Sequence, residues 1–152
     1  MTTWLTADEQ HTWRAFLAAS ALISTALDVQ LQRDADMPHG YYEVLVRLSE
    51  APEHTLRMSE LAATTGSSRS RLSHAVAALE LRGWVARRPC PTDRRGQLAT
   101  LTPAGLAVLE QAAPGHVQAV RDALFSALSP EQVRQLRCIG EAIAAHHQTA
   151  GS

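Results

Sequence analysis

Residues 67–105 read SSRSRLSHAVAALELRGWVARRPCPTDRRGQLATLTPAG, and the spacing of their apolar residues changes at Gly83. Before this glycine, apolar residues recur three and four positions apart, which predicts an amphipathic helix. After it, residues 84–88 and 97–101 have the composition of strands, and 89–96 would join them as a hairpin tip. The stretch therefore predicts a helix that is followed directly by a β-hairpin.

A shorter helix is predicted just before this stretch, over residues 60–65. We expect Ser59 to cap its start and Gly66 to end it, and either Ser67 or Ser68 to cap the helix that follows. Two helices joined by a turn of about three residues that contains glycine form a helix-turn-helix. With the hairpin behind it, the pattern predicts a winged helix-turn-helix.

Long amphipathic helices are predicted on both sides, over about residues 6–33 and 103–148. The sequences TADE at 6–9 and SPEQ at 129–132 have the spacing of capping boxes. Proline and glycine at 114–115 are expected to kink the C-terminal helix or to split it.

The predicted fold class is mostly α with a small β-hairpin wing. A further helix is expected from Pro38 to Glu50 and a short strand over 56–58. Together these elements make one domain, residues 1–152, whose winged helix-turn-helix occupies about 38–102.

Composition excludes several classes of protein. A hydrophobic content of 45% and a charged content of 19% exclude a disordered tail. Two cysteines are too few for a disulfide-stapled secreted fold, and the N-terminus lacks the pattern of a signal peptide. No apolar run approaches the roughly 18–20 residues that span a membrane. We therefore expect a soluble, cytoplasmic protein without a membrane partner.

The formal net charge is only −1, but the charges are unevenly distributed. From Arg57 to Arg95 there are eight arginines and three acidic residues, a balance of +5, whereas the remainder has six arginines and twelve acidic residues, a balance of −6. A basic middle between acidic flanks favours one polyanion-binding face. An accidental cluster on a solvated surface is the alternative.

The helix after Gly66 has one apolar face and one short polar face. Small side chains would let its backbone approach the major groove of DNA, where arginine, histidine and serine can reach base edges. An ordinary amphipathic surface helix is the alternative. The predicted DNA-contacting residues of this helix are Ser67, Ser68, Arg69, Ser70, Arg71, Ser73 and His74.

The hairpin tip carries Asp93, Arg94 and Arg95. Arginines at such a tip suit a narrow minor groove, where the negative potential is concentrated. Asp93 can bond a nearby amide or guanidinium and fix the loop. A solvated turn is the alternative.

Three segments together, LSHAVAALELRGWV (72–85), DRRG (93–96) and LTPAG (101–105), resemble the MarR family of winged-helix transcription regulators. The order of predicted helices on both sides is similar as well. The resemblance implies that Arg95 enters the minor groove, that Asp93 orients it, and that residues 67–74 face the operator.

The outer helices carry more apolar surface than a winged-helix core can cover. The resemblance implies that they are dimerisation helices and that a homodimer binds a palindromic operator in double-stranded DNA. An intrachain bundle is the alternative. We expect the regulator to be a repressor.

Family members often bind small phenolic or lipophilic molecules between their dimerisation and DNA-binding parts. A corresponding effector pocket is predicted from five residues, Trp13, Phe16, His39, Tyr41 and Tyr42. A core patch with a hydrophobic staple explains the same residues equally well.

Cys90 lies between two prolines and behind two arginines, which could favour its thiolate and make it a redox sensor. Cys138 is expected in the core or in a dimer interface. The seven histidines have no spacing typical of a metal site, and no nucleophile–base pair or phosphate loop indicates an enzyme, so we expect no metal, cofactor or catalytic activity.

The sequence thus favours a DNA-binding transcription regulator. Two alternatives remain open: a regulator gated by an effector or by oxidation of Cys90, and a winged-helix protein-interaction or dimerisation module that does not bind DNA. The second alternative has no need of arginines at the hairpin tip.

Overall fold

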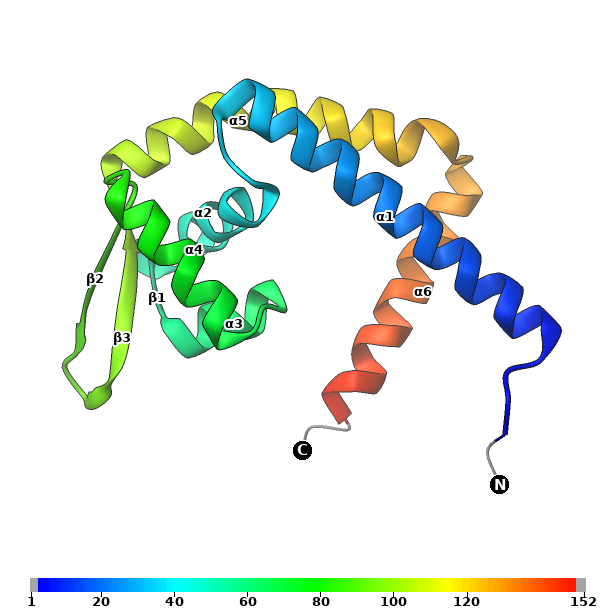
Figure 1. Cartoon of the computed structure of the whole chain (residues 1–152), viewed down its shortest axis with the longest axis horizontal. Helices are drawn as coiled ribbons and strands as arrows, with labels where there is room; N and C mark the ends of the chain where they lie inside the picture. Colours follow the sequence, from blue (N-terminus) through cyan, green and yellow to red (C-terminus); the bar gives the residue numbers. More distant parts are fainter. Residues whose placement is uncertain (1–2, 150–152) are drawn as a thin grey trace. The chain divides into compact units, whose positions relative to one another are not determined.

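The computed structural model describes residues 3–149 and divides into two compact units (Figure 1). One unit is the continuous segment Leu27–His116, and the other combines the chain before Leu27 with the chain from Val117 onward. Helices α1 (Ala7–Ala35) and α5 (Pro103–Ala123) each continue from one unit into the other. The predicted class is confirmed, because the chain is mostly helical with one small antiparallel sheet.

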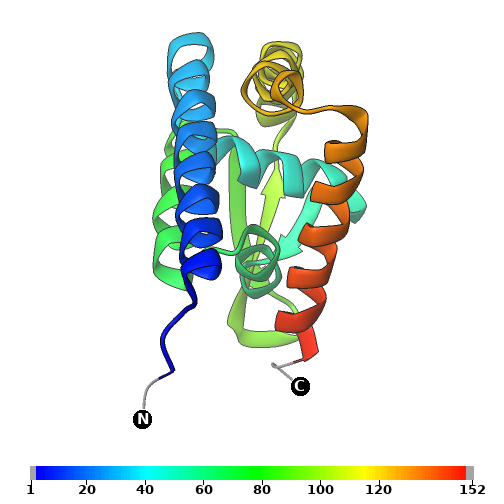
Figure 2. The ribbon, with the colours of Figure 1, turned by 90° about the vertical axis from the view of Figure 1, so that its right-hand side faces the viewer.

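The segment Leu27–His116 contains the winged helix-turn-helix, which we call the winged unit. Its elements between α1 and α5 are α2 (His39–Glu50), a 3-10 turn (Pro52–His54), β1 (Thr55–Arg57), α3 (Met58–Thr65), α4 (Arg69–Leu81), β2 (Val85–Cys90) and β3 (Asp93–Leu101). Strand β3 lies between β1 and β2, and both pairs are antiparallel. Helices α2 and α3 pack against β3, and α3 packs against α4 (Figure 2).

The core of the winged unit is built from aliphatic side chains. Helix α4 contributes Leu72, Val76 and Leu79 from one face, as the three- and four-residue spacing predicts. The other largest fully buried side chains are Leu31, Met37, Val44, Leu45, Leu48 and Leu61. Burial of this one face fixes which side of α4 remains exposed.

Helix α3 begins two residues earlier than predicted, and Ser59 is not its cap. The N-cap residue is Arg57, whose backbone N–H donates to the Glu60 carboxylate at 3.1 Å. The predicted end is confirmed, because Gly66 adopts a left-handed conformation with φ of 62°. The acidic residue, rather than the serine, therefore determines where this helix starts.

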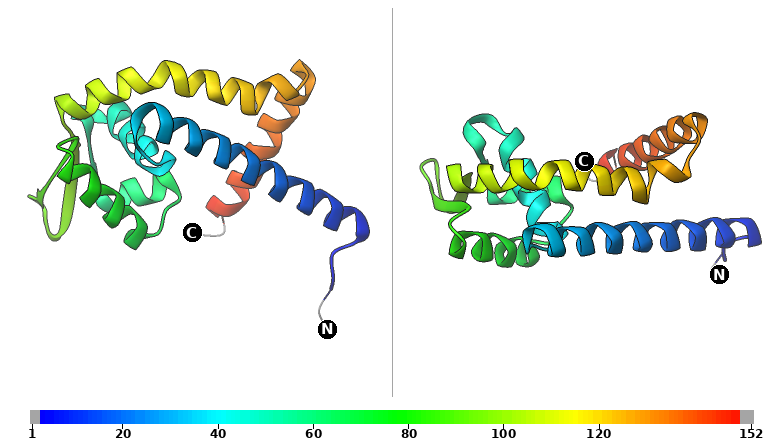
Figure 3. Two further views of the ribbon diagram at one scale, coloured as in Figure 1. Left: turned by 45° about the horizontal axis from the view of Figure 1, so that its top comes forward. Right: turned by 90° about the horizontal axis from the view of Figure 1, so that it is seen from above.

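The hairpin is longer than predicted, and it extends away from the helices of the winged unit (Figure 3). Its turn contains only Pro91 and Thr92, since Cys90 already pairs with Asp93. The register shifts between Pro89 and Cys90, and an irregularity of this kind accommodates a proline in a strand. As a result, Arg94 and Arg95 lie on β3 and not in the turn.

Gly105 lies in the first turn of α5, where the helix meets the chain just before β2. A Cβ atom on Gly105 would lie 2.2 Å from the Trp84 carbonyl oxygen and 2.7 Å from Leu101 Cδ1. The same carbonyl accepts a hydrogen bond from Thr102 N at 3.0 Å, and the Thr102 hydroxyl caps α5 by accepting from Gly105 N. Only glycine fits this close approach.

The outer helices α1 and α6 begin at the predicted capping boxes. The Thr6 and Glu9 side chains exchange hydrogen bonds with each other's backbone N–H groups, and the residues at 129 and 132 do the same. Helix α5 is not split at Pro114 and ends at Ala123; a 3-10 turn (Phe125–Ala127) precedes α6 (Pro130–Thr149).

The expectation about membrane-length segments needs correction. Helix α1 contains an 18-residue window of mean hydropathy 1.3 with at most two charged residues, so its length and composition suffice to cross a membrane. The sequence count missed this window because serine, threonine and glutamine interrupt its apolar residues. Core helices of soluble proteins can have the same composition, but only 17% of this window is buried in the single chain.

Candidate nucleic-acid interface

Helix α4 is held by its apolar face and exposes the face that the sequence assigns to DNA. Its cap is Ser68, whose hydroxyl accepts from Arg71 N at 3.2 Å. The predicted contact residues that are exposed are Ser68, Arg69, Ser70, Arg71, Ser73 and His74, whereas Ser67 is half-buried. The exposed set begins at the helix N-terminus, where unpaired N–H groups favour anions.

Several arginines on α4 and β3 have no protein partner. Within residues 3–149, no hydrogen bond or ion pair is formed by the guanidinium groups of Arg69, Arg71, Arg94 and Arg95. Each of these four residues is exposed. An unpaired guanidinium keeps its donors available for phosphate oxygens and base edges.

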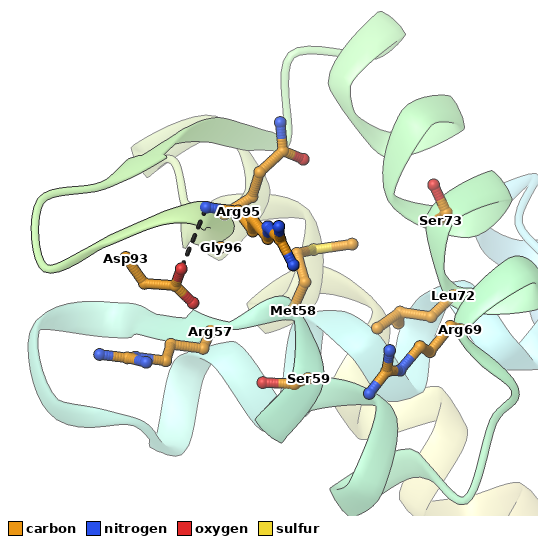
Figure 4. Close-up of a pocket in the computed structure, with 10 residues that line it drawn as sticks. Arg57, Met58, Ser59, Arg69, Leu72, Ser73, Asp93, Arg95 and Gly96 are labelled. Atoms are coloured by element: carbon orange, nitrogen blue, oxygen red, sulfur yellow. Dashed lines mark hydrogen bonds between the residues drawn. The ribbon is translucent and has the colours of Figure 1, made fainter.

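A groove of about 470 Å³ opens between α3, α4 and the hairpin, and we call it the wing groove (Figure 4). It is lined by Arg57, Met58, Ser59, Arg69, Leu72, Ser73, Asp93, Arg95, Gly96 and Gln97. Three arginines and one aspartate give this lining a formal charge of +2. The groove therefore suits an anionic ligand.

The wing groove joins residues from two predicted sets that are twenty or more positions apart in the sequence. Arg69 and Ser73 come from α4, and Asp93 and Arg95 come from β3. The remaining predicted DNA-contacting residues do not line it. Sequence reasoning missed the other six lining residues, of which Arg57, Ser59 and Gln97 are polar. Only the position of Arg57 in the basic segment pointed toward one of them.

Asp93 fixes the start of β3 through the backbone of Arg95. Its Oδ1 accepts a hydrogen bond from Arg95 N at 3.0 Å. A Cβ on Gly96 would lie 3.0 Å from Asp93 Oδ2, so the glycine leaves space for this carboxylate. The sequence allows either an amide or a guanidinium as the partner of Asp93, and in the structure the partner is the amide of Arg95.

Arg87 belongs to the basic segment from Arg57 to Arg95, but it is not available for DNA. Its guanidinium lies 2.6 Å from the Glu80 carboxylate, and its backbone N–H donates to the same carboxylate at 3.0 Å. These bonds from Arg87 lower the pKa of Glu80. The pair connects the end of α4 to β2 and so fixes α4 relative to the hairpin.

Cys90 is buried at the base of the hairpin turn, with 6% of its surface exposed. Its Sγ lies 3.4 Å from Thr92 Oγ1, and this hydrogen bond is the main reason why the pKa of the thiol is lowered. Arg57 lowers the same pKa further by its charge. The predicted direction of the shift is present, but it comes from Thr92 and Arg57 and not from the arginines that precede Cys90.

The predicted effector residues are distributed over both units. Trp13 and Phe16 lie in one unit, with ring centroids 6.1 Å apart. His39, Tyr41 and Tyr42 lie in the winged unit. There, the guanidinium of Arg82 lies 6.0 Å from the Tyr41 ring, and Arg82 also donates to the Asp36 carbonyl.

His116 completes a ring cluster that the sequence did not reveal. Its ring lies 4.3 Å from Tyr42 and 5.5 Å from His39, between centroids. Burial, together with the nearby His39, lowers the pKa of His116. Across the described part of the chain, no three histidine, cysteine or acidic side chains are grouped as metal ligands.

Comparison with known proteins agrees with this geometry. Residues 35–96 match the family model described as MarR family. Over 98 residues the chain is 34% identical to the transcriptional repressor MprA of Escherichia coli, an alignment that covers 64% of this chain and 55% of that protein. The chain thus spans about half the length of this curated relative.

Two solved structures from Streptomyces coelicolor are similar over almost their whole length. Sco3205, a MarR family transcriptional regulator solved in complex with DNA, is 55% identical, covers 94% of this chain and 90% of its own, and has a TM-score of 0.88. AbsC, another MarR family transcriptional regulator, is 39% identical. Its alignment covers 97% of this chain and 99% of AbsC, and it has the same TM-score of 0.88. The family suggested by the DRRG and LTPAG segments is confirmed, and this chain belongs to the MarR family of transcriptional regulators.

Proposed function

We propose that this protein is a sequence-specific transcription regulator, acting as a repressor, that binds a palindromic operator in double-stranded DNA as a homodimer. The family consists of non-enzymatic DNA-binding regulators. The observation that carries the proposal is the wing groove, where unpaired arginines of α4 and β3 lie beside the exposed face of α4. Such a protein acts in the cytoplasm of a bacterium.

The wing groove suggests which part of the DNA α4 and β3 would each contact. Helix α4 would enter the major groove, while Arg95 on β3 would reach the adjacent minor groove or its phosphates. Arginines without protein partners favour this function over the protein-interaction alternative, which gives no reason for a positively charged groove. The 55% identical relative Sco3205 was solved with DNA, which also supports it.

Replacing Arg95 with alanine should flatten the salt dependence of DNA binding. The logarithm of affinity falls with the logarithm of salt by about 0.9 per neutralised phosphate, so losing two contacts in a dimer changes the slope by roughly 2. The measurement is fluorescence anisotropy from low to moderate salt. Arg47→Ala is the matched control, because Arg47 is an exposed arginine of α2 outside the groove. An unchanged slope for Arg95→Ala would mean that the wing does not touch DNA.

Homodimerisation is supported by exposed apolar side chains of the unit formed by the chain ends. Among residues 130–148, whose side chains the structure describes, α6 has no buried residue, and α1 has none before Leu27. The large exposed apolar residues on α6 and on α1 before Leu27 are Trp13, Phe16, Leu17, Leu22, Leu136, Ile139 and Ile143. Large apolar side chains gathered on the surface of a soluble protein favour a protein–protein interface.

Light scattering in detergent-free buffer should give about twice the chain mass of 16.5 kDa. Ile139→Glu should abolish this dimer, since Ile139 is 56% exposed on α6 in the single chain. Leu81→Glu is the matched control, because Leu81 is 91% exposed but lies on α4. A well-behaved monomer of the unaltered protein would contradict the dimer.

The gated alternatives have weaker support. The lowered pKa of the Cys90 thiol favours oxidation, but burial of the side chain opposes access by an oxidant. An effector pocket built from Trp13, Phe16, His39, Tyr41 and Tyr42, with a small phenolic or lipophilic ligand, stays a proposal. Binding of such a molecule would be measured as release of DNA on its addition.

A further inference from the structure

Thr92 connects the hairpin turn to the rest of the winged unit. Its Oγ1 accepts a hydrogen bond from Nη2 of Arg57 at 2.9 Å, across 35 positions of sequence. The same oxygen lies 3.4 Å from the Cys90 thiol, which is buried. The exposed turn is thus attached on one side to Arg57 of β1 and on the other to Cys90 at the end of β2.

Arg57 is well placed to be the fixed end of this attachment. Its backbone is paired with Leu98 of β3, and its N–H is bonded to the Glu60 carboxylate at the start of α3. The side chain is half-buried, whereas Thr92 is exposed. Because the backbone of Arg57 is held twice, its guanidinium starts from a defined position.

The attachment occurs where the sheet itself gives no support. Strand β1 ends at Arg57, opposite Leu98, while β3 continues outward from there to Asp93 with β2 as its remaining strand neighbour. A two-stranded hairpin is marginally stable alone. The Arg57 side chain therefore reaches the part of the hairpin that β1 does not cover.

Arg95 depends on the geometry of this turn. Asp93 follows Thr92 directly and accepts from Arg95 N at 3.0 Å. Gly96 lets the Asp93 carboxylate pack closely, and Arg57 and Arg95 both line the wing groove (Figure 4). A displaced Thr92 would therefore displace the backbone from which the Arg95 side chain extends.

We propose that Arg57 is a positioning residue of the DNA-binding site: by bonding Thr92 it holds the wing turn so that Arg95 points into the wing groove. This inference rests on the proposed DNA-binding function. It assigns Arg57 an effect on DNA affinity that passes through Arg95. A direct contact between Arg57 and a DNA phosphate is the competing mechanism.

The first test is a double-mutant cycle between Arg57 and Arg95, measured by anisotropy. The probe is a fluorescein-labelled duplex of about 30 base pairs that the unaltered protein enriches from random sequences, long enough for two half-sites. Arg57→Ala should weaken binding about tenfold, as expected for a lost hydrogen bond from a charged group. In the Arg95→Ala background the same change should have less than about a twofold effect, because coupled residues are not additive.

Thr92 provides the matched pair of variants. Thr92→Val removes the hydroxyl at nearly constant shape and should reproduce the loss seen with Arg57→Ala. Thr92→Ser keeps the hydroxyl and should bind DNA like the unaltered protein. The double variant Arg57→Ala/Thr92→Val should be no weaker than either single variant.

A readout without DNA comes from amide hydrogen exchange of the free protein. The Arg95 N–H, which is bonded to Asp93, should exchange faster in Arg57→Ala and in Thr92→Val than in Thr92→Ser. Thermal melting serves as the fold control. The Thr92 pair lies on the exposed turn, so it tests the inference even if the arginine variant does not fold.

Three results would overturn the inference. The first is an equal loss for Arg57→Ala with and without Arg95, accompanied by a flatter salt dependence, which would identify a direct phosphate contact. The second is a Thr92→Val variant that binds and exchanges like Thr92→Ser. The third is a failure of the unaltered protein to enrich any duplex from random sequences. This failure would overturn the proposed function together with this inference, and it would be seen before any variant is compared.

Discussion

Replacing Gly105 with alanine is expected to lower the free energy of unfolding by about 3 kcal/mol, the upper part of the range for overpacking a tight contact. Alanine favours a helix over glycine by about 1 kcal/mol, so propensity alone predicts stabilisation. The contact with Trp84 reverses the sign of the expected change in stability. A Cβ at 2.2 Å from a backbone oxygen cannot be relieved by rotating a side chain.

Relief of this clash would move α5 away from Trp84 and would weaken the hydrogen bonds of Thr102. The Thr102 hydroxyl donates to the Gly83 carbonyl at 2.6 Å and accepts from Gly105 N at 3.0 Å. One methyl group thus disturbs the start of α5, the end of β3 and the turn after α4. This is why a large effect is expected from the smallest substitution.

The measurement is urea denaturation followed by circular dichroism, at one protein concentration because a dimer unfolds in a concentration-dependent manner. Gly40→Ala is the matched control: it lies in the first turn of α2, is exposed, and no atom lies within 4 Å of its added Cβ. It should be neutral or slightly stabilising. A Gly105→Ala protein as stable as Gly40→Ala would show that α5 does not pack as described.

Local signals in the sequence predicted the helices well, because each depends on residues a few positions apart. The capping boxes at 6–9 and 129–132, the Ser68 cap and the end of α3 at Gly66 are all present. The apolar face of α4 is also confirmed. These features need no information from distant parts of the chain.

The hairpin was predicted in kind but not in extent. Prolines at 89 and 91 read as a loop, since proline cannot donate to a strand ladder. The structure places the first of them at an irregularity of β2 and the second in the turn. A register shift of this kind is decided by the partner strand, so the sequence of one strand does not reveal it.

The sequence did not reveal the roles of Arg57 and His116, because their partners lie far away in the sequence. Arg57 bonds Thr92 across 35 positions, and His116 meets Tyr42 and His39 from α5. Arg87 belongs to the same basic segment but is bound to Glu80. Composition gives the charge of the basic segment, but only the fold shows which arginines are free.

Replacing Arg71 or His74 with alanine should have the largest effect on DNA sequence preference. Both side chains are exposed on α4, opposite its buried face, and in the described chain neither is bonded to another residue. A good base contact is worth about 1–3 kcal/mol of discrimination. Each substitution alters both half-sites of a dimer, so we expect at least a tenfold loss on the selected duplex and a much smaller change on shuffled DNA.

The contrast with the wing is part of this prediction. Arg95→Ala should reduce binding to selected and shuffled duplexes together, because minor-groove and phosphate contacts depend weakly on sequence. The two α4 variants should instead reduce the ratio of the two affinities. Arg47→Ala should change neither quantity, because Arg47 lies on α2 and does not line the wing groove.

The most direct test of the account is a competition titration of the unaltered protein and the Arg71→Ala/His74→Ala variant, at about 150 mM salt. The selected duplex competes against the same bases in shuffled order. We predict that the unaltered protein prefers the selected duplex by at least about a thousandfold and that the variant loses most of this preference while its melting is unchanged. Equal affinity of the unaltered protein for both duplexes would contradict sequence-specific recognition, and a variant with full preference would show that α4 does not read the operator.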